Sequence, residues 1–212
     1  MHLNTIGNPK SLIHFKHNNP NTQMEEITMA KTAIFLADGF EEIEALTVVD
    51  LLRRAGIEIT TVSIMGKKAV EGSHKITVEA DALFDEVDYD SMDMLILPGG
   101  MPGTTNLENY APLKEQVLKF NDSGKNLSAI CAAPTVYGKL GLLKGKKACC
   151  YPGRESDLLG ADVQYSEVTK DGIFITSRGM GTAIPFGLAI IEHFQGSAAA
   201  EDMAKKIVYA QS

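Results

Sequence analysis

A regular alternation of short apolar runs with helical patterns, from Lys31 onward, is the feature that most constrains the fold. The apolar runs are continuous, which is typical of strands buried on both faces of a parallel sheet. The segments between them repeat an apolar residue every three or four positions, the period of a helix packed on one side. The alternation predicts an α/β fold: a three-layer sandwich with a mostly parallel sheet and helices on both faces.

The same patterns place the individual elements. Strands are expected at residues 32–38, 57–65, 93–100, 126–131, 146–151 and 171–179, with a strand-and-turn excursion at 73–87. Helices are expected at residues 41–56, 111–124, 132–143, 183–196 and 197–210. In the first helix we expect one broad apolar face that consists of Ile43, Leu46, Val49, Leu51 and Leu52.

The length of 212 residues fits one domain with a sizeable core. Residues 1–28 are rich in Asn, Pro and His and show little periodicity. We therefore expect a poorly ordered lead or an artefactual extension there, with Met29 as an alternative start. Residues 29–212 are expected to form a single domain.

Charge and cysteine content exclude several classes of protein. A net charge of −7 argues against a binder that neutralises nucleic-acid phosphates. Three cysteines without a framework spacing indicate a reducing compartment, so we predict a cytoplasmic protein without disulfides. No apolar run approaches the roughly 20 residues of a membrane span, which predicts no membrane partner.

Four polar or glycine-rich segments directly follow expected strands. They are residues 38–44, 98–103, Cys131 and 177–182. In an open parallel sheet, ligands bind beyond the carboxyl ends of the strands. The four segments therefore predict one site at this edge of the sheet.

Cys131 lies between an expected strand and an expected helix, with the small residues Ala129 and Ala133 on either side. This spacing is typical of a nucleophile elbow. A helix start stabilises an anion by roughly 0.3–2 kcal/mol, which lowers a thiol pKa by only about one unit. A reactive thiolate at this position therefore needs a second stabilising group.

Structural roles compete with catalytic ones at each of these positions. Cys131 has the alternative of a small buried side chain at a turn, and Cys149 and Cys150 are expected to be structural. Glu41, Glu42 and Glu44 have the alternative of complementing the helix dipole. Of the five histidines, three lie in the lead, and neither His74 nor His193 is well placed to activate the thiol. No cluster has the ligand spacing of a zinc site, so no metal is predicted.

Four segments together resemble the ThiJ/PfpI superfamily: "LADGFEEIEALTVVDLLRRAGI", "LPGGMPGTTNL", "AICAAPTVYGKLGLL" and "DGIFITSRGMGTA". They look most like its parkinsonism-associated deglycase branch and the bacterial YajL-type proteins. The resemblance runs from about Lys31 to Tyr209. It implies a flavodoxin-like fold, similar to class I glutamine amidotransferases, and a homodimer.

The resemblance also implies roles for individual residues. Cys131 corresponds to the reactive cysteine, and Glu44 to the glutamate that hydrogen-bonds it. The backbone N–H groups of Gly99, Gly100 and Ala132 would form an oxyanion hole. Glu44 stabilises a thiolate only when it is protonated, because a carboxylate would repel the sulfur charge.

Four further residues would lie near the site or the dimer interface: Arg53, Arg54, His74 and Tyr151. Two departures from the family pattern matter. Ala132 stands where the peptidase branch has histidine, which argues against a protease. Tyr151 stands where the human-type branch has histidine, which favours the bacterial branch and leaves the general base unassigned.

The resemblance implies a cysteine-dependent enzyme that needs no cofactor. It would be a glyoxalase III or protein deglycase, acting on methylglyoxal, glyoxal or early glycation adducts under carbonyl and oxidative stress. The alternative function is a redox-sensing chaperone, in which the thiol of Cys131 is oxidised to a sulfinate and substrate turnover is unimportant.

Overall fold

The computed structural model describes residues 29–209, so the expected lead at 1–28 lies outside the described residues. Seven strands form the central sheet in the order β10-β11-β7-β6-β1-β2-β5. All neighbours pair in parallel except β10, which is antiparallel to β11. The strands are β1 (Lys31–Leu36), β2 (Glu58–Ser63), β5 (Ala82–Leu83), β6 (Met94–Leu97), β7 (Asn126–Ile130), β10 (Val168–Asp171) and β11 (Phe174–Ser177). The predicted α/β sandwich with a mostly parallel sheet is confirmed.

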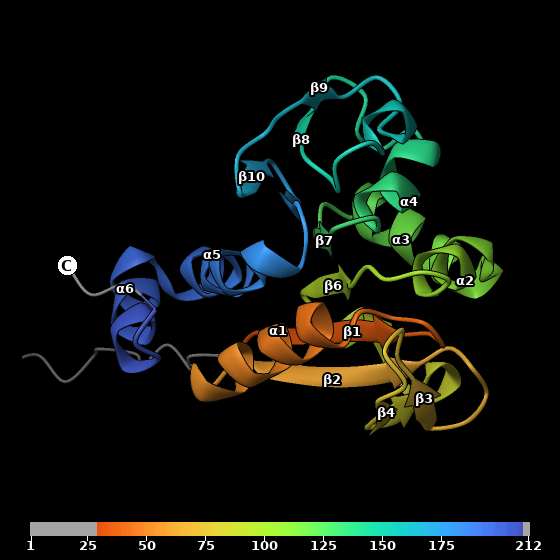
Figure 1. Ribbon diagram of the computed structural model, residues 1–212, viewed down its shortest axis with the longest axis horizontal. Helices are drawn as coiled ribbons and strands as arrows, with labels where there is room; N and C mark the ends of the chain where they lie inside the picture. Colours follow the sequence, from red (N-terminus) through yellow and green to blue (C-terminus); the bar gives the residue numbers. More distant parts are fainter. Residues whose placement is uncertain (1–28, 210–212) are drawn as a thin grey trace, which may run out of the picture.

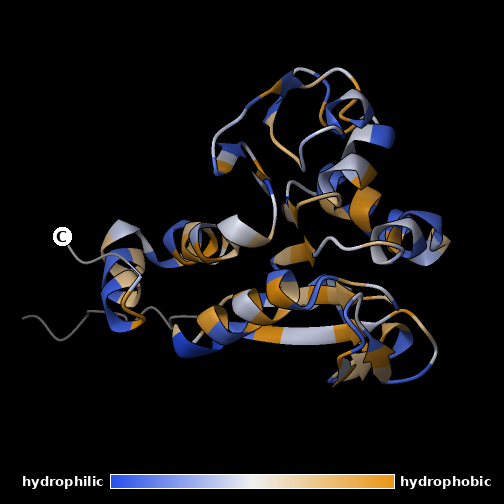
Figure 2. Ribbon diagram, in the orientation of Figure 1, coloured by the Kyte–Doolittle hydropathy of each residue, from blue (hydrophilic) through white to orange (hydrophobic). Residues whose placement is uncertain are grey.

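Helices cover both faces of this sheet (Figure 1). The helices α1 (Glu42–Arg54), α5 (Ala183–Gln195) and α6 (Ser197–Lys206) pack on one face. The helices α2 (Gly103–Asn109), α3 (Ala111–Asp122) and α4 (Pro134–Lys139) pack on the other. In Figure 2 the apolar stretches of the central strands and of the inner helix surfaces meet between the layers.

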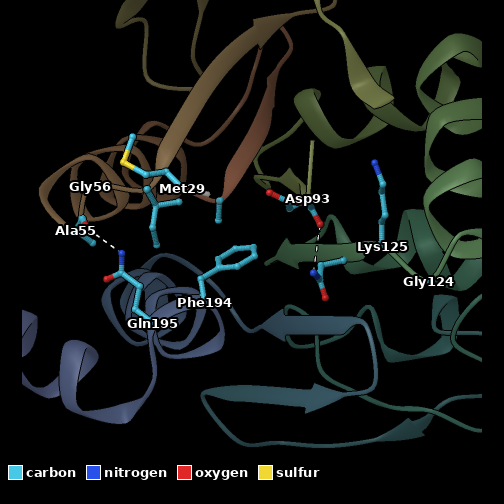
Figure 3. A pocket seen from close by; sticks show the side chains of 11 residues that line it. Met29, Ala55, Gly56, Asp93, Gly124, Lys125, Phe194 and Gln195 are labelled. Atoms are coloured by element: carbon cyan, nitrogen blue, oxygen red, sulfur yellow. Dashed lines mark hydrogen bonds between the residues drawn. The ribbon is translucent and has the colours of Figure 1, made fainter. Parts of the chain in front are cut away.

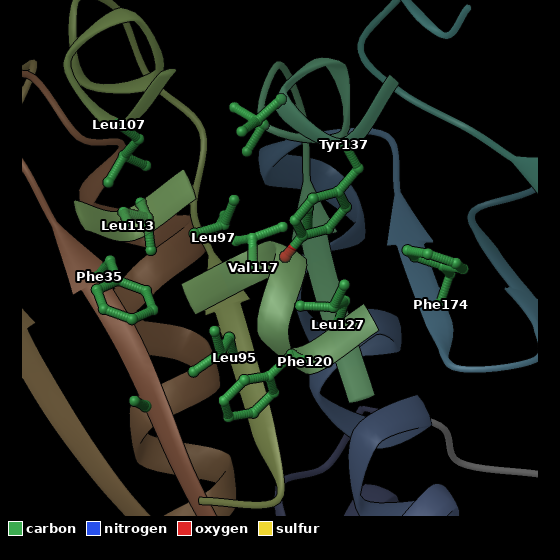
Figure 4. Close-up of a cluster of buried hydrophobic side chains, with 14 of the residues drawn as sticks. Phe35, Leu95, Leu97, Leu107, Leu113, Val117, Phe120, Leu127, Tyr137 and Phe174 are labelled. Carbon is green, nitrogen blue, oxygen red and sulfur yellow. The ribbon is translucent and has the colours of Figure 1, made fainter. Parts of the chain in front are cut away.

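Each face of the sheet has its own hydrophobic core. Along β1, Ala33 and Phe35 point into the core beneath α3 and α4, while Ile34 and Leu36 point into the core beneath α1 and α5. Figure 4 shows the first of these cores, in which Phe35 lies near leucines of the neighbouring strand and of the covering helices. Because alternate side chains are buried on opposite faces, the strand has no polar face, and this explains its continuous apolar sequence.

The strand expected at residues 146–151 is wrong in extent and in place. Only β8 (Lys147–Ala148) is extended, and it pairs with β9 (Asp162–Val163) in a separate two-stranded sheet. Cys149 and Cys150 follow β8 and are both buried. The segment is apolar because it covers the end of β11, where the N–H of Cys149 donates to Thr176 Oγ1 at 3.0 Å.

The expected single apolar face of α1 is also wrong in part. Val49, Leu51 and Leu52 are buried, but Ile43 is 49% exposed and Leu46 is 36% exposed. The two exposed side chains lie three positions apart, so they share one stripe of the helix. The helix therefore has an inner apolar face on the sheet and an outer apolar stripe.

The strand-and-turn excursion is a hairpin of β3 (Ala69–Glu71) and β4 (Thr77–Glu79), followed by the short strand β5. Within residues 29–209, no helix is both long and apolar enough to cross a membrane.

A hollow of about 640 Å³ opens at the amino ends of the strands, where Met29, Asp93 and Phe194 are among the lining residues (Figure 3). It lies at the edge of the sheet opposite to the four segments that were expected to form a site.

Candidate active site

The four segments that follow expected strands do come together. They follow β1, β6, β7 and β11, which are neighbours in the order β11-β7-β6-β1. Because these strands are parallel, their carboxyl ends lie at one edge of the sheet. The convergence inferred from the sequence is therefore present in the structure.

Cys131 directly follows β7 in a left-handed conformation, with a φ angle of 65°. Its N–H donates to the carbonyl of Ser177 at 2.9 Å, and its carbonyl accepts the N–H of Tyr151 at 2.7 Å. A non-glycine residue in this conformation costs roughly 1–3 kcal/mol and persists where the surroundings fix it. The chain thus makes the sharp strand-to-helix turn that was expected, and α4 begins three residues later at Pro134.

Glu44 reaches this turn from the first turn of α1, and it is 1% exposed. Its Oε2 accepts the N–H of Gly99 at 2.9 Å, and its carboxyl is hydrogen-bonded to the thiol of Cys131. A Cβ at Gly99 would lie 2.6 Å from both Glu44 Oε2 and Cys131 Cβ. Only glycine fits between the acid and the cysteine at this position.

Burial raises the pKa of Glu44 to about 7, with a smaller contribution from the charge of Glu41, against the hydrogen bonds from Cys131 and Gly99. Burial also raises the pKa of Cys131, and the negative charge of Glu44 raises it further, to about 12. The N–H groups of Ala132 and Gly100 act in the opposite direction. Burial thus outweighs the expected effect of the helix start. The thiol of Cys131 keeps its proton near neutral pH, and Glu44 is the member of the pair that titrates there.

The three backbone N–H groups assigned to an oxyanion hole have different partners. The N–H of Gly99 is already bonded to Glu44, so it is not free for a substrate oxygen. The N–H groups of Gly100 and Ala132 point to the sulfur of Cys131. The proposed oxyanion hole is therefore reduced to Gly100 and Ala132.

Tyr151 lies beside this site, with 52% of its surface exposed. A Cβ at Gly179 would lie 3.4 Å from the Tyr151 ring and 4.0 Å from Glu44 Oε1. The loop after β11 thus closes the site between the tyrosine and the acid. The sequence marked this loop as part of the site but gave no role to Gly179.

Arg53 and Arg54 lie at the other end of α1. Arg53 lies nine positions after Glu44, which corresponds to about 14 Å along the helix axis. Arg53 pairs with Asp81 at 2.7 Å, and Arg54 pairs with Asp50 at 2.6 Å. The structure does not bring these two arginines into the site.

The acidic run at the start of α1 divides between two places. Glu44 turns to Cys131, whereas Glu42 and Glu41 turn to His74 at the tip of the β3–β4 hairpin. Among residues 29–209, Glu41, Glu42 and His74 are the one group whose ligand atoms are close enough to hold a metal ion. Glu42 already accepts two backbone N–H groups, so we keep the prediction of no metal.

A model of the DJ-1/PfpI family matches residues 30–193. The chain belongs to the DJ-1/PfpI family. The predicted membership in this superfamily, and the fold that it implied, are therefore confirmed.

Several relatives in the family cover most of this chain. The protein dj-1beta of Drosophila melanogaster is 39% identical over 186 residues, which is 86% of this chain and 99% of the relative. A protein named a deglycase in Pyrococcus abyssi is 33% identical over 154 residues, 71% of this chain and 91% of the relative. DJ-1 homolog B of Arabidopsis thaliana is 37% identical over 84% of this chain, but the match spans only 41% of that longer protein.

Solved structures of the family have the same fold. The oxidized form of Toxoplasma gondii DJ-1 superposes with a TM-score of 0.82 at 33% identity, covering 86% of this chain and all of that one. Drosophila melanogaster DJ-1beta superposes with a TM-score of 0.80 at 35% identity and the same coverage. A closer relation to the bacterial YajL-type proteins stays a prediction.

Proposed function

We propose that this protein is a cysteine-dependent glyoxalase III or protein deglycase, with Cys131 as nucleophile and Glu44 as proton carrier. The observation that carries the proposal is the buried contact between the carboxyl of Glu44 and the thiol of Cys131. An acid with a pKa of about 7 can both give and take a proton near neutral pH, which is what a carbonyl addition requires. The deglycase name of the Pyrococcus abyssi relative supports this assignment.

The chemistry balances without a cofactor. The sulfur of Cys131 adds to the aldehyde carbon of methylglyoxal, and the C=O electron pair moves to oxygen, which the N–H groups of Gly100 and Ala132 stabilise. The alkoxide gains a proton. The hydrogen on that carbon then leaves as a proton while the neighbouring ketone oxygen gains one, which gives an enediol. The former ketone carbon is then protonated as the first hydroxyl loses its proton. One carbon is oxidised and its neighbour is reduced, which gives a thioester of lactate. One water molecule then cleaves the thioester and restores the thiol.

Glycation adducts can enter the same sequence. In an early adduct, the amine, thiol or guanidine group departs as the leaving group, and the dicarbonyl fragment follows the path to lactate or glycolate. The half-exposed position of Cys131, at the edge of the sheet beside the exposed ring of Tyr151, supports access by a group carried on another protein.

A second candidate function has its own observation. One of the similar structures is the oxidized form of Toxoplasma gondii DJ-1. In this chain Cys131 is half-buried, whereas Cys149 and Cys150 are buried, so an oxidant would reach Cys131 first. In a redox-sensing chaperone, peroxide would oxidise the same thiol to a sulfinate, and Glu44 would hydrogen-bond one of the sulfinate oxygens.

We also propose a homodimer in a reducing, cytoplasmic setting. The outer apolar stripe of α1, Ile43 and Leu46, supports an interface on that helix. All three cysteines are free, as they would be in the cytoplasm.

The direct test is the conversion of methylglyoxal to lactate by purified protein without glutathione. Wild type and Cys149→Ala are expected to produce lactate, because the thiol of Cys149 is buried among core residues. Cys131→Ser is expected to lose turnover while its thermal unfolding curve stays close to that of the wild type. Equal rates for wild type and Cys131→Ser would exclude the proposed enzyme.

A further inference from the structure

The tip of the β3–β4 hairpin, residues 72–76, is fastened to the start of α1. Glu42 Oε1 accepts the N–H of His74 at 2.8 Å and the N–H of Ile76 at 3.4 Å. The N–H of Ser73 donates to the carbonyl of Phe40 at 2.8 Å. The side chain of the first residue of α1 and the backbone of the segment before the helix therefore both hold the hairpin tip.

Glu42 is buried beneath the hairpin tip, with only 2% of its surface exposed. A Cβ at Gly72 would lie 2.2 Å from Glu42 Oε1, so the hairpin backbone lies directly on the carboxylate. Burial alone would raise the pKa of Glu42, but the hydrogen bonds that it accepts outweigh burial and lower the pKa to about 2. The carboxylate is thus charged at every physiological pH, and it needs a cation or donors around it.

His74 supplies the cation that faces this carboxylate. Its Nδ1 lies 3.1 Å from Glu42 Oε2 and 3.6 Å from Glu41 Oε2, and 3.0 Å from the hydroxyl of Ser73. The other charged groups near the tip pair with one another instead. Lys75 pairs with Glu71 at 2.8 Å, and Lys67 pairs with Asp38 at 3.8 Å.

The fastened segment is directly connected to the candidate active site. The N–H of Glu41 donates to the carbonyl of Gly99 at 2.9 Å, and Gly99 in turn donates its own N–H to Glu44. Glu42 and Glu44 share the first turn of α1. Residues 41–42 are therefore linked by one hydrogen bond to Gly99, the residue whose N–H holds Glu44.

We propose that His74 is a proton-operated latch: as an imidazolium it holds the hairpin tip on Glu41 and Glu42, and so seats the turn that presents Glu44 to Cys131. His74 is a positioning residue in this role, because it does not contact the thiol. The latch does not depend on which reaction, if any, Cys131 performs.

The direction of the pH dependence follows from the contacts. The hydrogen bond to Glu42 and the charge of Glu41 raise the pKa of His74 above its ordinary 6.5. The latch is thus fully closed below about pH 6.5 and opens as the pH rises through the raised value. Glu42 stays ionised throughout this range, so His74 is the group of the contact that titrates there.

The test is hydrogen exchange of residues 72–76, expressed as protection factors below about pH 6 and above about pH 8. In the wild type we expect protection to fall by about two- to five-fold at the higher pH, the range of an exposed ion pair. His74→Arg, with a permanent charge, should keep its protection at both pH values. His74→Gln should show the lower protection at both. Protection of α3 should be the same in all three proteins.

A second readout joins the latch to the site. The rate of alkylation of Cys131 against pH should lose one inflection in His74→Gln and in His74→Arg, while the inflection that belongs to Glu44 remains. Wild-type protection that does not change with pH would overturn the proposal. The proposal would also be overturned if protection of residues 72–76 changed only when sedimentation changed as well. His74 would then act through contact between subunits.

Discussion

The backbone N–H of Gly99 donates to Glu44 Oε2 at 2.9 Å, on the side of the acid that faces Cys131. One peptide group therefore fixes the acid, while the missing side chain of Gly99 leaves room for the thiol. The relative position of the two reacting side chains depends on a residue that has no chemistry of its own.

Gly99→Ala should disrupt this arrangement. Its Cβ would lie 2.6 Å from Glu44 Oε2 and from Cys131 Cβ, both of them well-fixed atoms. We expect a loss of roughly 1–3 kcal/mol in the free energy of unfolding, as for other overpacked cores, together with loss of Cys131 reactivity. Gly181→Ala is the matched control, because a Cβ there meets nothing within 4 Å. Equal effects of the two substitutions in urea unfolding would contradict the steric argument.

Glu44→Gln should stabilise the fold at alkaline pH. The pKa of Glu44 is raised from 4.5 to about 7, so its favourable proton is fully bound below about pH 4.5 and is lost as the pH rises through 7. By about pH 8 the variant should exceed the wild type by up to about 3 kcal/mol, with little difference near pH 5. Denaturant unfolding across this range measures the difference.

Glu42→Gln should change the free energy of unfolding in the opposite direction in the same experiment. The pKa of Glu42 is lowered from 4.5 to about 2, so its charge stabilises the fold above about pH 4.5. This variant should be less stable than the wild type at neutral pH, and the deficit should disappear in acid. Two variants with the same sign would show that the environments of the two carboxyls have been assigned wrongly.

The reactivity of the thiol should follow the protonation of Glu44. A protonated Glu44 donates to the sulfur of Cys131, and a glutamine keeps part of this donation without a charge. We expect Glu44→Gln to retain a measurable rate of iodoacetamide alkylation, with a pH profile that lacks the inflection near 7. Below about pH 6, where Glu44 is protonated, Glu44→Ala should alkylate more slowly than the wild type, because the donor is gone. Above about pH 8 it should alkylate faster, because the charge that raises the pKa of Cys131 is gone. A faster reaction in Glu44→Ala at both pH values would show that the acid only suppresses the thiolate.

Mild peroxide should oxidise one cysteine before the others. Cys131 is half-buried, whereas Cys149 and Cys150 are 0% and 2% exposed. We expect mass spectrometry of tryptic peptides to find two added oxygens at Cys131 while the peptide with the other two stays unchanged. Protein that oxidises in this way and does not turn over methylglyoxal would favour the sensor over the enzyme. First oxidation at Cys149 would exclude the sensor.

Charges on the outer stripe of α1 should separate the proposed dimer. Ile43→Asp with Leu46→Asp would place two carboxylates where an apolar contact is expected. Sedimentation should show monomers at concentrations where the wild type is dimeric. Leu159→Asp is the control, because Leu159 is 53% exposed and lies away from α1 in the turn after Leu158. Dimers that survive the double substitution would place the interface elsewhere.

The position of the site could be predicted because it depends on strand order, and strand order follows from apolar runs. A glycine-rich loop, an acidic helix start and Cys131 each directly follow a buried strand, so a parallel sheet must bring them together. The pairing of Glu44 with the cysteine came from family resemblance. No periodicity distinguishes Glu44 from Glu42, which lies two residues earlier and is equally buried.

Other features could not be read from local sequence. Residues 146–151 are apolar like a strand, but they cover the end of β11 instead of joining the sheet. The sequence predicts one apolar face for α1, whereas the structure has an inner face and an outer stripe. Apolar spacing does not tell which side of a helix meets the sheet. The contact of Glu42 with His74 joins residues 32 positions apart, and only the folded hairpin reveals it.

The left-handed backbone at Cys131 has a consequence for selection in the laboratory. Glycine adopts this conformation without strain, so Cys131→Gly would relieve roughly 1 kcal/mol even as it removes the thiol. A library of this gene screened only for heat resistance should therefore accumulate glycine at this codon. The same library grown under dicarbonyl or peroxide challenge should retain cysteine, and the divergence between the two populations would report which stress the residue serves.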